Sequence, residues 1–154
     1  MRHRSSHEDT THRTDGGVII RPADVKPRLD RERGFDDEFY VPHSRFTKLH
    51  KQDIDKVPQL SIIAESDESG IYMVMARGGR EFYITGHSEY SPNTLDYEYH
   101  RDLEKGKNPS VPVNYYPDND PSKAPIVRWK AHANLLYSNW LNYFVYQETP
   151  YDIN

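Results

Sequence analysis

The chain has 154 residues, 35% of them hydrophobic, which suffices for one domain with a modest core. Its formal charge of −4 is spread over interspersed acidic and basic residues, so the sequence indicates neither nucleic-acid binding nor a polybasic membrane-binding face. Cysteine is absent, which excludes disulfides and thiolate metal sites from these residues; with no transmembrane-length apolar run and no signal peptide, we expect a cytoplasmic protein that binds small molecules.

Residues 1–32 differ in composition from the rest of the chain. Three histidines lie there among Arg, Ser, Thr and Asp, and residues 18–20 form the only apolar island. The three histidines do not have the spacing of a zinc finger. We therefore predict a disordered or weakly ordered leader rather than a metal site.

Short strands are predicted across the middle of the chain. Residues 34–44 read as a loop and then an extended segment, with one apolar side formed by Phe35, Phe39 and Val41. A short helix is expected within residues 48–56. Turn residues then separate three predicted strands, at 60–64, 71–76 and 82–85.

Three polar residues, His43, Ser44 and Arg45, end the first extended segment. The residues by themselves predict a surface ion pair from Arg45 to Asp36 or Asp37. They predict a turn-capping hydroxyl at Ser44. They indicate no role for His43.

The strand at 82–85 leads into Gly86, His87 and Glu89. A glycine lets the backbone turn there without steric penalty, so both side chains can sit at the end of the strand. A carboxylate beside an imidazole can fix the ring tautomer and stabilise its protonated form, as a general base requires. As a bare pattern His-x-Glu is common in solvated loops, so these residues alone do not settle the role.

Two helices are predicted in the last third of the chain. The first is capped by Ser91, begins with Pro92 and ends at Gly106. Its predicted inward stripe is Leu95, Tyr99 and Leu103. After a proline-rich loop or lid at 107–125, the second helix spans 126–147, with a core stripe of Trp129, Ala133, Leu136, Trp140 and Phe144.

Glu98 and Arg101 lie three positions apart on the first helix and are therefore neighbours on one side of it. The ordinary interpretation is a surface salt bridge worth under about 1 kcal/mol. A guanidinium is also the group that clamps a substrate carboxylate with two hydrogen bonds. The residues alone leave both interpretations open.

Several longer sequence motifs follow one another along the chain. They are Arg33-Gly-Phe-Asp-Asp37, Pro42-His-Ser-Arg45, Thr85-Gly-His-Ser-Glu-Tyr90, Tyr99-His-Arg-Asp102, Asn114-Tyr-Tyr-Pro117, Asn139-Trp-Leu-Asn-Tyr143 and 146–152. Together they resemble the C-terminal half of the homoserine O-acyltransferases of methionine biosynthesis. The resemblance covers residues 33–154, which we take as one unit after the leader.

The resemblance implies an α/β fold, the C-terminal part of a class I glutamine-amidotransferase-like fold, with three short strands followed by two helices. It implies a Cys-His-Glu triad in which cysteine takes the acyl group from acetyl-CoA or succinyl-CoA and the homoserine hydroxyl then attacks the thioester. In that scheme His87 and Glu89 are catalytic, and Ser44 and Arg101 bind substrate. Glu98 is at most a supporting residue. The acyl-CoA is a co-substrate, and no cofactor or metal is implied.

The family's cysteine belongs to its N-terminal half, which this sequence does not contain. We therefore expect a fragment that is inactive alone and is completed by the missing half or works within a homodimer. The oligomeric state stays open. One alternative is a pseudoenzyme module that binds ligand without catalysis. A weaker one is a metal site from His87, Glu89 and another histidine. The choice between acetyl and succinyl donors stays open.

Overall fold

The computed structural model describes residues 14–22, 34–45 and 47–147, and for residues 14–22 the backbone alone. Five strands form a sheet in the order β2-β1-β3-β4-β5, and each neighbouring pair is antiparallel. The strands are β1 (Thr14–Pro22), β2 (Phe39–Arg45), β3 (Leu60–Ser66), β4 (Gly70–Ala76) and β5 (Glu81–Ile84). The strands predicted from the sequence at 60–64, 71–76 and 82–85 are confirmed as β3, β4 and β5.

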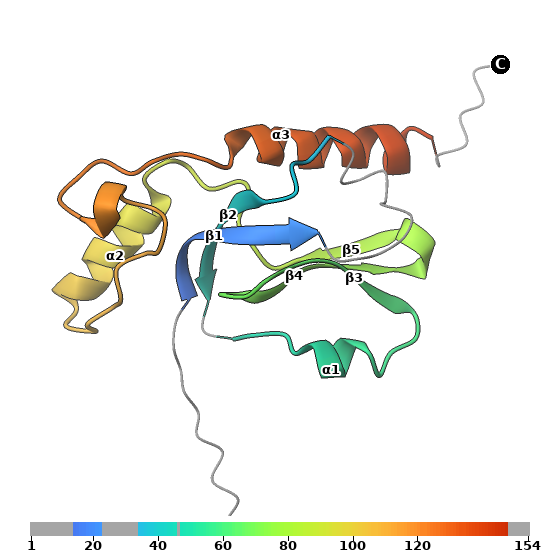
Figure 1. The fold of residues 1–154 in the computed structure, drawn as a ribbon, viewed down its shortest axis with the longest axis horizontal. Coiled ribbons are helices and arrows are strands. Elements are labelled where there is room, and N and C mark those ends of the chain that lie inside the picture. The colour runs from blue at the N-terminus through green and yellow to red at the C-terminus, as the bar shows by residue number, and fades with distance from the viewer. Residues whose placement is uncertain (1–13, 23–33, 46, 148–154) are drawn as a thin grey trace, which may run out of the picture.

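Helices cover both faces of this sheet (Figure 1). Helix α3 runs along one face, the short α1 lies against the opposite one, and α2 lies beyond one end of the strands. The helical segments are α1 (Lys51–Ile54), η2 (Arg77–Gly79), α2 (Thr94–Glu104), η3 (Pro117–Asn119), α3 (Lys130–Asn139) and the π-helical η4 (Trp140–Val145).

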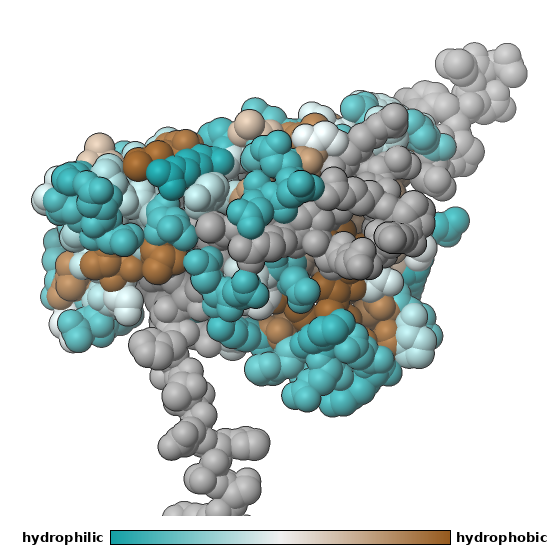
Figure 2. All heavy atoms as spheres, in the orientation of Figure 1, coloured by the Kyte–Doolittle hydropathy of each residue, from teal (hydrophilic) through white to brown (hydrophobic). Residues whose placement is uncertain are grey.

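Three apolar clusters hold these layers together. The largest packs Phe39 and Val41 of β2, with β3 and β4, against Leu136 of α3. A second joins the other side of β3 and β4 to Ile54 of α1. Figure 2 shows a hydrophobic patch between the sheet and the polar surface of α1. The third cluster fixes α2 and the following loop to the start of α3 through Leu95, Tyr115, Tyr116 and Trp129.

The leader prediction is wrong for part of its length. Residues Thr14–Pro22, expected to lack regular structure, form β1, which pairs with β2 along seven residue pairs and with the end of β3. The apolar residues 18–20 are in that ladder. Residues 1–13 and 23–33 lie outside the described part of the chain.

Both predicted helices are present, but their apolar stripes are partly wrong. Helix α2 buries Leu95 and Tyr99 as expected, whereas Leu103 is 42% exposed, since the described elements leave the last turn of that stripe uncovered. The second helix begins at Lys130 rather than at residue 126, since the Ile126 amide donates to the Tyr115 carbonyl at 2.8 Å and is thereby held outside a helix. Trp140, predicted to be core, is 45% exposed.

Gly86 is required for a reason other than the predicted one. Its φ is not positive, so no left-handed turn demands a glycine there. A Cβ at this position would instead lie 2.6 Å from Val41 Cγ1, 2.8 Å from His43 Cε1 and 2.9 Å from Tyr72 Cε2. The chain after β5 therefore passes so close to β2 and β4 that only a residue without a side chain fits.

Gly86→Ala should destabilise the chain by about 1–3 kcal/mol, because buried groups must move to accept the methyl. Urea unfolding of both forms measures the difference. Gly106→Asn is the matched control, since no atom lies near its missing Cβ and asparagine tolerates the left-handed backbone (φ +68) of that helix end; it should cost less than about 1 kcal/mol. Equal stability of Gly86→Ala and the parent would contradict the contact argument.

Candidate active site

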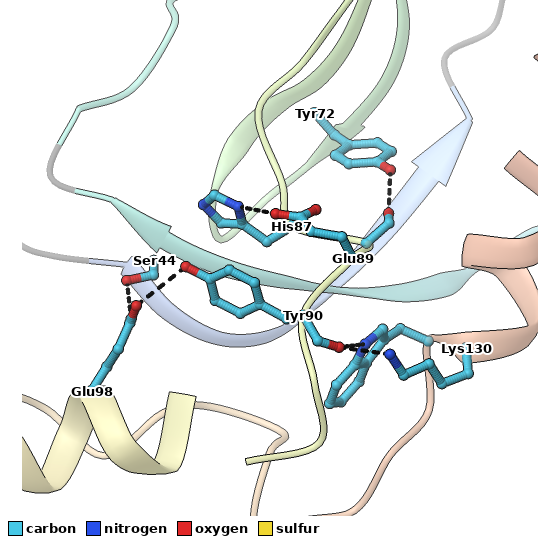
Figure 3. A network of polar contacts seen from close by, with 9 residues as sticks. Ser44, Tyr72, His87, Glu89, Tyr90, Glu98 and Lys130 are labelled. Atoms are coloured by element: carbon cyan, nitrogen blue, oxygen red, sulfur yellow. Dashed lines mark hydrogen bonds and ion pairs between the residues drawn. The ribbon is translucent and has the colours of Figure 1, made fainter. Parts of the chain in front are cut away.

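His87 and Glu89 form a hydrogen-bonded pair just beyond the end of β5 (Figure 3). His87 Nδ1 lies 2.9 Å from Glu89 Oε1, and the side chains are 35% and 58% exposed. A carboxylate only accepts, so in the neutral ring Nδ1 carries the hydrogen and Nε2 carries the lone pair. This tautomer is the one that a general base needs, and solvent reaches the pair.

Backbone hydrogen bonds fix the segment that carries this pair. The Thr85 amide donates to the Tyr72 carbonyl at 2.9 Å, and the His87 amide donates to the Pro42 carbonyl at 2.8 Å. Between the two functional residues, Ser88 is buried and its hydroxyl lies 3.1 Å from the Tyr72 hydroxyl. Burial raises the pKa of Tyr72 to about 12, so this phenol stays protonated.

Tyr90 supports His87 from the other side. The two rings are stacked, with centroids 4.3 Å apart and an interplanar angle of 13°. The Tyr90 carbonyl accepts hydrogen bonds from Trp129 Nε1 at 3.2 Å and from Lys130 Nζ at 2.7 Å (Figure 3). The start of α3 therefore holds the loop in place, and the loop holds the imidazole.

Ser44 and Glu98, 54 positions apart in sequence, meet beside this loop (Figure 3). The Ser44 hydroxyl donates to Glu98 Oε2 at 2.5 Å, and the Tyr90 hydroxyl donates to Glu98 Oε1 at 3.2 Å. One carboxylate thus links β2, the His87 loop and α2. The sequence marked Glu98 only as a supporting residue and did not single out Tyr90. Tyr90 nevertheless ends the motif that contains His87, and Glu98 directly precedes the motif that contains Arg101.

Arg101 lies on α2, one turn beyond Glu98. Its Nε donates to the buried carboxylate of Asp102 at 3.1 Å, and Lys107 Nζ approaches the same oxygen at 3.4 Å. The Arg101 side chain is about half exposed. A guanidinium is the side chain that can bind a carboxylate bidentately.

His43, for which the sequence predicted no role, is fully buried on β2 at 0% exposure. Its Nδ1 donates to the Val41 carbonyl at 3.2 Å, which leaves the lone pair on Nε2. Burial lowers the pKa of His43 to about 4, with smaller contributions in the same direction from Arg45 and His87. The ring is therefore neutral at physiological pH.

Arg45 does not pair with Asp36 as the sequence predicted. Its guanidinium donates to the carbonyls of Ser69 and Ile71 in the β3–β4 hairpin, and Asp36 instead contacts His132 Nε2 at 3.1 Å. Burial lowers the pKa of Arg45. The residue ties β2 to the neighbouring hairpin.

Within the described residues, no group of three or more His, Asp or Glu side chains is arranged to hold a metal ion. The helices in that part of the chain are all too short or too polar to cross a membrane. The polar groups gathered at the end of β5 suit proton transfer and the binding of a small polar molecule.

The chain matches the family model of homoserine O-succinyltransferase over residues 17–151. It is similar to proteins named homoserine O-acetyltransferase: 71% identical over 122 residues in Phocaeicola vulgatus and 61% over 122 in Brevibacillus brevis, each match covering 79% of this chain and 40% of the relative. Against Parabacteroides distasonis the identity is 66% over 133 residues, covering 86% and 43%. The chain thus spans about 40% of the length of these relatives, and the family match begins inside the predicted leader.

Solved structures confirm the predicted fold class. Glutamine amidotransferases from Thermotoga maritima and Methylobacillus flagellatus each superpose with a TM-score of 0.52, at 15% and 13% identity. The matches cover 86% and 84% of this chain and 51% and 52% of theirs. At such low identity the likeness concerns the fold alone.

The depressed pKa of His43 makes folding stability depend on pH. The unfolded imidazole binds a proton near pH 6.5 and the buried one only near pH 4, so the free energy of unfolding should fall by about 3 kcal/mol as the pH drops from 6.5 to 4. Urea unfolding at both pH values measures this loss. His43→Leu should remove that part of the decline, while His100→Leu, at a half-exposed site, should keep it. An unchanged pH dependence in His43→Leu would count against the buried neutral ring.

Proposed function

Because the chain belongs to the homoserine O-succinyltransferase family, we propose that it carries the acid-base and substrate-binding part of a homoserine O-acyltransferase, which transfers an acyl group from acyl-CoA to the homoserine hydroxyl. The observation that carries this proposal is the accessible His87–Glu89 pair at the end of β5. Names of relatives with 61–71% identity support acetyl-CoA as the donor, whereas the family model's name supports succinyl-CoA. Acyl-CoA is the co-substrate, and the reaction needs no other cofactor.

His87 acts as the base in this proposal. Its Nε2 takes the proton from the nucleophile as that attacks the acyl thioester, and gives it to the leaving CoA thiolate. It then takes the proton of the homoserine hydroxyl, which attacks the acyl-enzyme, and returns that proton to the nucleophile as it leaves. Glu89 holds the tautomer and stabilises the imidazolium between these steps.

The nucleophile comes from outside these 154 residues. They contain no cysteine, and they cover about 40% of the relatives' length. The resemblance to the family implies a cysteine in the other part. The His87 ring is accessible and has its lone pair on Nε2. It is therefore suited to accept the proton of a thiol that a second segment presents.

Arg101, Ser44 and Glu98 bind homoserine in this proposal. The Arg101 guanidinium pairs with the substrate carboxylate. Glu98 lies one helical turn away, and its carboxylate can accept from the substrate ammonium. The Ser44 hydroxyl donates to the Glu98 carboxylate and fixes its direction. Opposite charges one turn apart match the two charged groups of an α-amino acid.

A chimera tests the catalytic pair. The chain from residue 14 onward, which keeps β1, is joined to the part of the Phocaeicola vulgatus relative that this chain does not cover, and transfer from acetyl-CoA and succinyl-CoA to homoserine is followed. His87→Ala should lower kcat by about 10⁶-fold and Glu89→Gln by about 10⁴-fold, as for triad residues elsewhere. His100→Ala, on α2 outside the pair, is the control and should retain activity. The 154-residue chain alone should show no turnover, and turnover by it above background would refute the proposed division of labour.

The substrate-binding residues should affect KM more than kcat. In the same chimera, Arg101→Lys loses the bidentate geometry and should raise KM for homoserine by about 10- to 100-fold, equivalent to about 1.4–2.7 kcal/mol. Arg77→Lys changes an exposed arginine paired with Glu81 and should leave KM unchanged. A normal KM in Arg101→Lys would exclude the carboxylate contact.

A further inference from the structure

His43 lies directly beneath the segment that carries His87. It follows Phe39 and Val41 on the buried side of β2, and it is as fully enclosed as any residue of the core. A polar ring in such a position is unusual, because burying it costs free energy unless its polar atoms find partners. Its Nδ1 has one in the Val41 carbonyl; its Nε2 has none among the described residues.

The ring is in contact with the backbone before His87. A Cβ on Gly86 would lie 2.8 Å from His43 Cε1, so the existing Gly86 backbone already rests against the imidazole edge. The next residue donates its amide to the carbonyl of Pro42, the neighbour of His43. One residue pair on β2 thus supplies both the surface and the hydrogen bond that set the position of His87.

The hydrogen bond from Nδ1 to Val41 spans only two residues and therefore fixes the ring angle locally. Burial is the main cause that lowers the pKa of His43, and Arg45 on β2 and His87 on the facing loop act in the same direction. The Tyr72 phenol on β4 is a neutral neighbour, with ring centroids 5.9 Å apart.

We propose that His43 is a positioning residue for His87: its neutral, locally tethered ring seats the Gly86 backbone so that the His87 imidazole faces the reacting groups. This assignment rests on the proposed role of His87 as the base. It also explains why a polar ring occupies a core position where a leucine of similar size would pack.

Amide hydrogen exchange followed by NMR on the 154-residue chain tests this. His43→Leu keeps the volume but loses the tether, and should accelerate exchange of the His87 amide by about 10-fold or more relative to amides of β4. His43→Asn, whose side-chain amide can donate to the Val41 carbonyl as Nδ1 does, should restore most of the protection. His100→Leu, on α2, is the control and should change neither.

Two results would overturn the proposal: unchanged exchange at His87 in His43→Leu, or an equal acceleration across β4, which would mean that the ring only fills the core. If His43→Leu does not fold, the unmodified chain gives the answer. On lowering the pH from 6 to 4, His43 gains a proton, and exchange at His87, corrected for its intrinsic rate, should rise before that of β4; parallel changes would overturn the proposal. Because exchange does not depend on catalysis, a chimera that shows no acyl transfer would refute the proposed function without affecting this result.

Discussion

The close passage of Gly86 over β2 and β4 is the constraint on which the rest of the site depends. With no side chain at this position, the backbone approaches Val41 and His43 closely enough for the next amide to reach the Pro42 carbonyl. Interiors are packed at the density of organic crystals, so such a contact defines a position to within a fraction of an ångström. The His87 imidazole is attached next to this fixed backbone position, so its own position is well defined.

Hydrogen bonds to side chains then connect the fixed point to the two large helices. Tyr90 stacks on His87. Its carbonyl accepts hydrogen bonds from the start of α3, and its hydroxyl donates one to Glu98 of α2. Glu98 in turn accepts from Ser44 on β2. The apolar cluster of Leu95 with Tyr115, Tyr116 and Trp129 holds α2 in place for these contacts, and the Tyr115 hydroxyl donates to the Pro92 carbonyl at 2.6 Å. These contacts hold α2 at a set distance from the His87 imidazole.

The sequence predicted most individual helices and strands, but it predicted poorly which elements pack against one another. Alternation and turn residues located β3, β4 and β5, and Ser91, Pro92 and Gly106 indicated α2. The predicted cap is wrong, since the N-cap of α2 is Asn93 and the helix begins at Thr94. The errors fell where tertiary contacts decide: Leu103 of α2 and Trp140 of η4 each continue the apolar stripe of their own helix, yet both are exposed. Residues 14–22 have the mixed composition of a leader, yet β2 pairs with residues 14–20 and β3 pairs with residues 21 and 22.

By itself the sequence determined which groups the candidate site contains: a histidine and a carboxylate two residues apart after a strand, an arginine on the following helix, and no cysteine. Local spacing is enough for this, since His87 and Glu89 are neighbours in any extended turn. Only the tertiary structure decided that Ser44 meets Glu98 across 54 residues and that His43 lies under Gly86. Those contacts follow from strand register and helix packing, which depend on the whole chain at once and leave no mark at a single position.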